Sequence, residues 1–144
     1  MKRVYVPAIA LLIALIVMSV SAQTKPKKDP AVRGEYIVTR VSMCVDCHTP
    51  MKDGKPDATR QLSGAPLTFK PIETAPHWMP AAPNLRSDGF LKGWTDAQLQ
   101  TFLMTGKTPE GDMAHPPMPQ YRLNKGDAAG VTAYLRSLKP VPAK

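Results

Sequence analysis

The feature that most constrains this chain is a five-residue run, Cys44-Val45-Asp46-Cys47-His48. It contains both cysteines of the 144-residue sequence, and a histidine follows the second cysteine directly. The pattern C-x-x-C-H is typical of a covalent attachment site for haem c. Two thiols on one turn can bond the two vinyl-derived carbons of a haem, which leaves the next imidazole under the iron. The pattern therefore predicts Cys44 and Cys47 as the attachment residues and His48 as the proximal iron ligand.

Three other interpretations of the run are weaker. A thioredoxin-like redox pair normally follows a strand in a βαβ pattern, and no such pattern surrounds residues 44–48. Structural zinc needs four ligands, whereas outside the run only His77 and His115 remain as histidine or cysteine donors. A disulfide between Cys44 and Cys47 would close a loop too short to stabilise the fold much. We therefore favour the haem.

The run resembles the haem-attachment motif of the c-type cytochromes, and Pro83-Asn84-Leu85 resembles the P-N-L segment of their class I members. In that family the proline carbonyl accepts the N–H of the proximal imidazole, and the resemblance implies this role for Pro83. Trp94 resembles an aromatic residue that packs near the haem, although an ordinary core tryptophan is an equal alternative. The resemblance implies an all-α cytochrome c fold, with three to four short helices and long loops around one covalently bound haem c and its iron.

The second iron ligand is expected in the proline-rich segment 107–120. A thioether on a rigid loop suits a Met/His site, and Met118 is flanked by prolines on both sides. The segment Pro-Pro-Met-Pro-x-Tyr, which ends at Tyr121, resembles the distal-ligand segment of cytochrome subunits attached to periplasmic dehydrogenases. The resemblance implies Met118 as the distal ligand and leaves Met113 as the alternative. Ligation by Met79, or by a second histidine at position 77 or 115, is a weaker alternative.

Helical periodicity is present at both ends of the domain and before the segment 107–120. Apolar residues from Ile37 to Val41 predict a helix over 34–43 that runs into the cysteine motif. Thr95 and Gln98 fit a capping box, and Gly106 ends the run that follows. Asn124 begins a last helix with a buried stripe from Val131 to Leu138. The resemblance further implies that the first helix crosses the last, with Gly34 and Tyr36 at the crossing.

The stretch 49–93 has seven prolines and little periodicity. A structureless loop of this length normally argues against a compact domain. A haem resolves the conflict, because loops around it can bury their apolar residues against the porphyrin. The expected lining residues are Leu62, Leu67, Phe69, Ile72, Trp78 and Leu85.

The N-terminus has the pattern of an export signal. Two basic residues precede an apolar run over 4–20, and small residues at Ser21 and Ala22 suit cleavage. We expect residues 1–22 to be a signal peptide, with an uncleaved anchor as the alternative. Residues 23–33 are then a flexible basic linker and 34–142 a cytochrome c domain. The implied location is periplasmic or secreted, or the outer face of the inner membrane if the anchor is kept.

A six-coordinate iron has no open position for substrate, which predicts an electron-transfer protein of the respiratory chain rather than an enzyme. The alternative is a haem enzyme or gas sensor with a labile or missing sixth ligand. The sequence has 19 basic and 11 acidic residues, a formal charge of +8, which suits a redox partner with an acidic docking surface. Since the basic residues are scattered without interleaved aromatics, we expect no nucleic-acid partner. Membrane contact is expected only if the N-terminal segment is retained.

Overall fold

The computed structural model describes residues 29–142, so the predicted signal peptide 1–22 and residues 23–28 of the predicted linker lie outside the described residues. Four α-helices, three short π or 3₁₀ turns and four two-residue strands occur in this range. In chain order they are α2 (Pro30–Tyr36), η1 (Ile37–Val41), α3 (Cys44–His48), β1 (Met51–Lys52), β2 (Lys55–Pro56), η2 (Ala58–Arg60), β3 (Ala65–Pro66), β4 (Ala81–Ala82), η3 (Phe90–Gly93), α4 (Asp96–Thr105) and α5 (Lys125–Ser137). The expectation of a mostly helical domain with long loops is confirmed. Between residues 29 and 142 no helix is long and apolar enough to cross a membrane.

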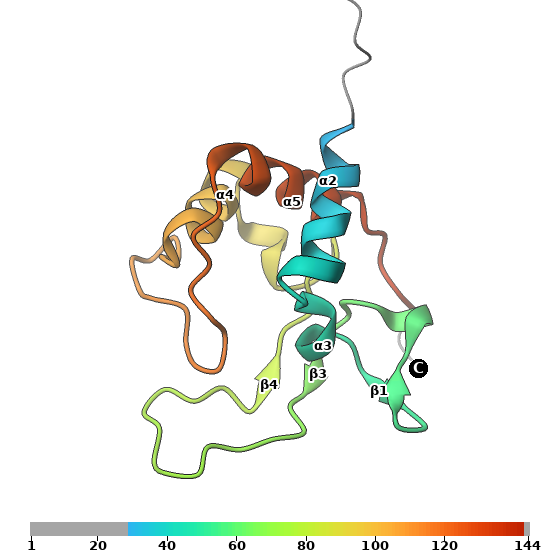
Figure 1. Cartoon of the computed structure of the whole chain (residues 1–144), viewed down its shortest axis with the longest axis vertical. Helices are drawn as coiled ribbons and strands as arrows, with labels where there is room; N and C mark the ends of the chain where they lie inside the picture. Colours follow the sequence, from blue (N-terminus) through green and yellow to red (C-terminus); the bar gives the residue numbers. More distant parts are fainter. Residues whose placement is uncertain (1–28, 143–144) are drawn as a thin grey trace, which may run out of the picture.

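The first and last helices of the described range, α2 and α5, cross in close contact (Figure 1). Gly34 and Gly130 meet at the crossing, where a Cβ atom added to Gly34 would lie 1.9 Å from the Gly130 carbonyl oxygen. The absence of side chains at both positions therefore lets the two backbones touch. Arg33 donates to the Asp127 carboxylate at 2.9 Å beside this contact. Gly34 was expected at the crossing, but Tyr36 is exposed, and the buried tyrosine is Tyr134 of α5.

The first helix begins earlier and ends differently than predicted. Asp29 caps it by accepting from the backbone N–H of Ala31, and Pro30 occupies a first-turn position that needs no N–H donor. The helix therefore starts at Pro30 instead of Gly34, and the last four residues of the predicted linker are helical. It continues as the π-helical turn η1 and stops at Ser42, because Met43 takes a left-handed conformation with φ 48°. The cysteine motif thus lies on a separate helix, α3.

Two capped helices complete the core. Thr95 and Gln98 form the predicted capping box of α4, and Gly106 ends that helix with φ 77°. Asn124 caps α5 by accepting from the Asp127 N–H. The buried apolar side chains are Ile37, Val38, Leu62, Leu91, Leu99, Leu103, Ala128, Val131, Tyr134 and Leu135. They come from α2–η1, α4, α5 and the loop between α3 and α4, and Cys44 and Val45 of the cysteine helix pack against this core.

The proline-rich stretch after α3 is folded by two small antiparallel ribbons, β1 with β2 and β3 with β4. The first closes over Asp53 and Gly54, both at positive φ, as a two-residue hairpin turn requires. The second pairs Ala65 with Ala82, and the 14-residue segment 67–80 between its strands forms the lower edge of the molecule in Figure 1. The ribbon returns the chain to α3, which brings Pro83 beside the cysteine motif.

Candidate functional site

Both thiols and the imidazole of the motif are on the five-residue helix α3. Cys44 and Cys47 are free thiols, each partly buried. Burial raises the pKa of Cys44 to about 11, and burial also raises the pKa of Cys47. One turn of backbone therefore presents two protonated thiols and an imidazole together, which is the donor set that covalent haem attachment needs.

The His48 side chain is buried, with 4% of its surface exposed. Its Nδ1 lies 2.8 Å from the carbonyl oxygen of Pro83. Because a carbonyl can only accept, this contact assigns the proton to Nδ1. Burial lowers the pKa of His48, and the hydrogen bond to Pro83 opposes this with a smaller upward effect. The ring is therefore neutral at pH 7, and its Nε2 lone pair is available for a metal.

The backbone around Gly64 holds the Pro83 carbonyl in this position. The Gly64 N–H donates to the His48 carbonyl oxygen at 2.8 Å, next to the β3–β4 ribbon. Gly64 has φ +83°, and an added Cβ would lie 2.7 Å from the backbone nitrogen of Asn84. Only glycine satisfies both conditions without strain. The sequence interpretation missed this residue, because a single glycine in a loop gives no signal until its partner segment is known.

Leu62 corrects the expectation that it lines the haem. Its side chain has no exposed surface in the presence of protein atoms alone, so it belongs to the protein core. Its backbone has φ 61°, in the left-handed region. Its N–H donates to Thr49 Oγ1 at 3.1 Å, and its carbonyl accepts from the N–H of Leu85 at 2.9 Å. These two bonds turn the Leu62 side chain inward and connect α3 to the segment that contains Pro83.

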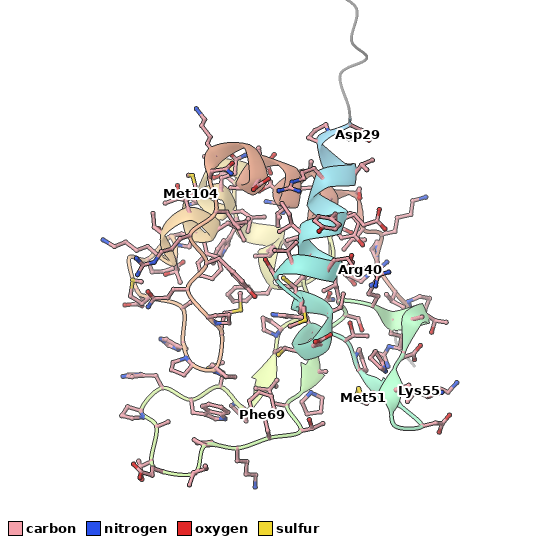
Figure 2. All side chains as sticks on the ribbon, in the orientation of Figure 1. Asp29, Arg40, Met51, Lys55, Phe69 and Met104 are labelled. Atoms are coloured by element: carbon pink, nitrogen blue, oxygen red, sulfur yellow. The ribbon has the colours of Figure 1, made fainter. Side chains whose placement is uncertain are left out.

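The methionines differ in how the structure places them. Met118 is partly buried, and its N–H donates to the His115 carbonyl at 3.0 Å. Met113 is 37% exposed, and its methyl group packs against Gly106 at the end of α4. Met79 is 46% exposed. Met104, on α4, packs against the core. In Figure 2 it lies in the upper part of the molecule, whereas Phe69 of the loop 67–80 lies in the lower part.

Tyr121 connects the methionine segment to the cysteine helix. Its hydroxyl donates to the carbonyl of Ser42 at 2.6 Å, across 79 residues of sequence, and lies beside the Cys44 thiol. Burial raises the pKa of Tyr121 far above its usual range, so the hydroxyl stays a donor at all ordinary pH values. This bond fixes the chain three residues after Met118 against the turn that begins α3. The sequence interpretation used Tyr121 only as part of a motif and assigned it no contact.

Trp94 lies at the end of η3, partly buried against the core. Its ring makes an edge contact with the ring of Phe102 of α4, with the ring centroids 5.3 Å apart. It makes a tilted contact with the ring of Phe90, with the centroids 5.4 Å apart. Arg136 of α5 donates to the Trp94 carbonyl and pairs with Asp96. These contacts are those of a core tryptophan, and packing of Trp94 near a haem stays a prediction.

The side chains of α3 fit a covalently bound haem c. The thiols are not joined to each other, and the imidazole has Nδ1 engaged and Nε2 available. The Tyr121 bond to Ser42 holds a methionine segment against the turn that precedes this helix. Cys44, Cys47 and His48 would hold the group. Nitrogen and thioether sulfur are the donors found in Met/His haem sites.

Comparison with known proteins gives a consistent result. The family model described as cytochrome c matches residues 31–139. The chain is 31% identical over 127 residues to the "Alcohol dehydrogenase (quinone), cytochrome c subunit" of Gluconacetobacter polyoxogenes and to that of Komagataeibacter europaeus, covering 81% of this chain and 26% of each relative. It is 32% identical over 121 residues to the "Fructose dehydrogenase cytochrome subunit" of Gluconobacter japonicus, covering 78% of this chain and 22% of that protein. The chain thus spans about a quarter of the length of the curated relatives it matches.

Proposed function

This chain belongs to the cytochrome c family, and from that premise we propose that it carries single electrons on one haem c whose axial ligands are His48 and Met118. The observation that carries the proposal is the buried imidazole of His48. It follows the cysteine pair directly and has its Nδ1 engaged by the Pro83 carbonyl. An imidazole held in this way presents Nε2, and only Nε2, to an iron.

Each residue of the site has a defined task. Cys44 and Cys47 attach the haem covalently through their sulfurs. The bound haem supplies an Fe(III)/Fe(II) couple, and Met/His ligation raises its reduction potential. Pro83 accepts the Nδ1 proton of His48, which fixes the tautomer and raises the basicity of the ligand nitrogen.

Burial and tethering support Met118 over the other methionines as the distal ligand. Met118 is less exposed than Met113 or Met79, and the Met113 side chain is already in contact with Gly106. The Tyr121 hydrogen bond to Ser42 ties the Met118 segment to the chain just before the helix that contains His48. A thioether held at both flanks loses little further conformational freedom when it binds iron.

Two protein ligands leave no coordination position for a substrate, so the proposed chemistry is electron transfer. The second candidate is a haem enzyme or gas sensor in which the thioether is labile. The two differ in the reaction of the reduced protein with carbon monoxide, which is fast only when the sixth position opens.

We further propose that the chain works outside the cytoplasmic membrane, in the periplasm or at the outer face of the inner membrane. Covalent haem attachment is completed there in this family. The names of the relatives describe cytochrome subunits of dehydrogenases, which suggests a dehydrogenase as the electron donor for this chain. The formal charge of +8, or +6 once Lys2 and Arg3 are removed with the signal peptide, favours docking to an acidic surface on the partner.

The test is an optical spectrum of the holoprotein, produced in a host that matures haem c, for the wild type, Met118→Ala and Met113→Ala. We expect a low-spin c-type spectrum with a sulfur-to-iron charge-transfer band in the oxidised state. Met118→Ala should remove this band and open the reduced iron to carbon monoxide, and Met113→Ala should leave both properties unchanged.

A band that survives Met118→Ala and disappears in Met113→Ala would transfer the ligand role to Met113. Fast binding of carbon monoxide to the wild type would favour the enzyme or sensor. A protein that leaves the maturing host without covalent haem would overturn the assignment of Cys44 and Cys47.

A further inference from the structure

Two of the three histidines in the sequence lie in contact with each other at the surface. They belong to two different loops, and both are distant in sequence from the cysteine helix. His77 lies on the segment between β3 and β4, and His115 lies on the segment between α4 and α5. Their ring centroids are 5.3 Å apart, with the ring planes inclined by 38°. Both side chains are exposed, and neither makes a hydrogen bond to another described residue.

The backbone holds this pair together. The N–H of Met79, two residues after His77, donates to the carbonyl of Pro116, the residue after His115, at 2.8 Å. His77 itself has φ 62°, in the left-handed region. Such a conformation is uncommon for a residue with a side chain, and it persists where surrounding structure fixes it. The two rings therefore lie in contact because their loops are joined by this backbone hydrogen bond.

The separation of the rings matches chelation of one metal ion. A zinc–imidazole bond is about 2.0–2.1 Å, and the ring centre lies about 1.1–1.2 Å beyond the nitrogen. Two imidazoles on one tetrahedral ion therefore have centroids about 5 Å apart.

We propose that His77 and His115 form a binding site for one divalent transition-metal ion. Imidazole nitrogen suits Zn²⁺, Cu²⁺ and Ni²⁺. No third histidine, cysteine, aspartate or glutamate of the described part of the chain joins the pair in a metal-binding group, so water completes the coordination and the ion exchanges readily. Bound metal links the loop 67–80 to the loop that contains Met118. The site does not depend on whether Met118 or Met113 is the distal haem ligand.

The experiment must use the holoprotein. Without haem, the free thiols of Cys44 and Cys47 beside His48 would themselves bind zinc tightly and obscure the result. With haem attached, all three groups are engaged. Zn²⁺ is the probe because it is redox-inert and leaves the haem oxidation state unchanged.

We expect isothermal titration of the wild-type holoprotein with ZnCl₂ to give one site per molecule. His77→Ala and His115→Ala should each weaken binding by at least about tenfold, because the second linked ring no longer adds to the affinity of the first. The double variant should lose less than the sum of the two single losses, because either substitution alone already breaks the chelate. Thr74→Ala, on the same loop, is the matched control and should bind like the wild type. Zn²⁺ should also raise the melting temperature of the wild type and Thr74→Ala, and of neither histidine variant.

Three results would overturn the site. The first is zinc binding that persists in the double variant with the wild-type affinity and stoichiometry. The second is a loss that is additive over the two histidines, which would show two independent surface residues. The third is a wild-type titration without a saturable site.

Discussion

At the scale of single residues, the site depends on backbone groups as much as on side chains. The acceptor for His48 is the carbonyl of Pro83, and the donor to the His48 carbonyl is the N–H of Gly64. The sequence predicted Cys44, Cys47 and His48 because covalent haem attachment requires this spacing of two thiols and an imidazole. It identified Pro83 by resemblance to the family. It could not predict Gly64, Thr49 or the Tyr121 contact, since each depends on a segment far away in the chain.

Gly64→Ala tests the backbone support of His48, with Gly54→Ala as its matched control. Both glycines have positive φ, but an added Cβ meets nothing within 4 Å at Gly54 and lies 2.7 Å from the Asn84 nitrogen at Gly64. In both variants the free energy of unfolding should fall by about 1–2 kcal/mol, because alanine is strained in the left-handed conformation. Gly64→Ala should lose a further 1–3 kcal/mol or so by overpacking, measured by denaturant unfolding of the holoprotein.

The same pair of variants should differ in reduction potential. Displacement of the Pro83 carbonyl weakens the hydrogen bond to Nδ1 and makes the ligand nitrogen less basic, which favours Fe(II) and raises the potential. Gly54→Ala should keep the wild-type potential. Equal potentials in Gly64→Ala and the wild type would show that Gly64 does not support the ligand.

At the scale of secondary-structure elements, the contact between α2 and α5 decides whether the haem-bearing turn is held in place. The first helix was expected from apolar periodicity and the last from its cap and buried stripe. Asn124 caps α5 as the sequence predicted, and Thr95 and Gly106 begin and end α4 in the same way. The break at Met43 was not predicted. It arises because the π-helical turn η1 and the left-handed conformation of Met43 change the direction of the helix axis. The spacing of apolar residues does not predict such a change of direction.

Gly34→Ala tests the helix crossing. A methyl group at this position would lie 1.9 Å from a backbone oxygen of α5, and backbone cannot rotate away as a side chain does. The helices must separate, so the free energy of unfolding should fall by about 3 kcal/mol or more. Gly93→Ala, where an added Cβ meets nothing within 4 Å, should change it by less than about 0.5 kcal/mol. Thermal melts of both holoproteins provide the measurement, and equal stabilities would contradict the close contact.

At the scale of the whole molecule, the apolar core is small for the length of chain that it organises. Its buried residues come from the helices and from Leu62 and Leu91, whereas the loops 67–80 and 107–120 contribute none. Long proline-rich loops without a core of their own are uncommon in compact domains. The resemblance to the family explained them in advance as haem-wrapping segments, but their paths could not be read from the sequence, because no periodic pattern specifies them.

The form without haem should therefore be largely unfolded. We expect the Cys44→Ala/Cys47→Ala variant, produced without covalent haem, to show reduced helical circular dichroism and a broad melt, whereas the holoprotein melts cooperatively. A domain of this size buries a modest fraction of its surface and depends on extra stabilisation. A cooperative melt of the variant at the holoprotein temperature would show that the protein core suffices alone.

The acceptor that fixes the His48 tautomer is a main-chain oxygen, which has a consequence for how this site can vary during evolution. No point mutation at position 83 deletes that oxygen, because every amino acid has one. Variation can also displace it through the neighbours that set its approach, and Gly64 is one of these, since an added Cβ there would lie 2.7 Å from the Asn84 nitrogen. Purifying selection on the ligand geometry should thus fall also on Gly64, a residue that never touches the haem iron.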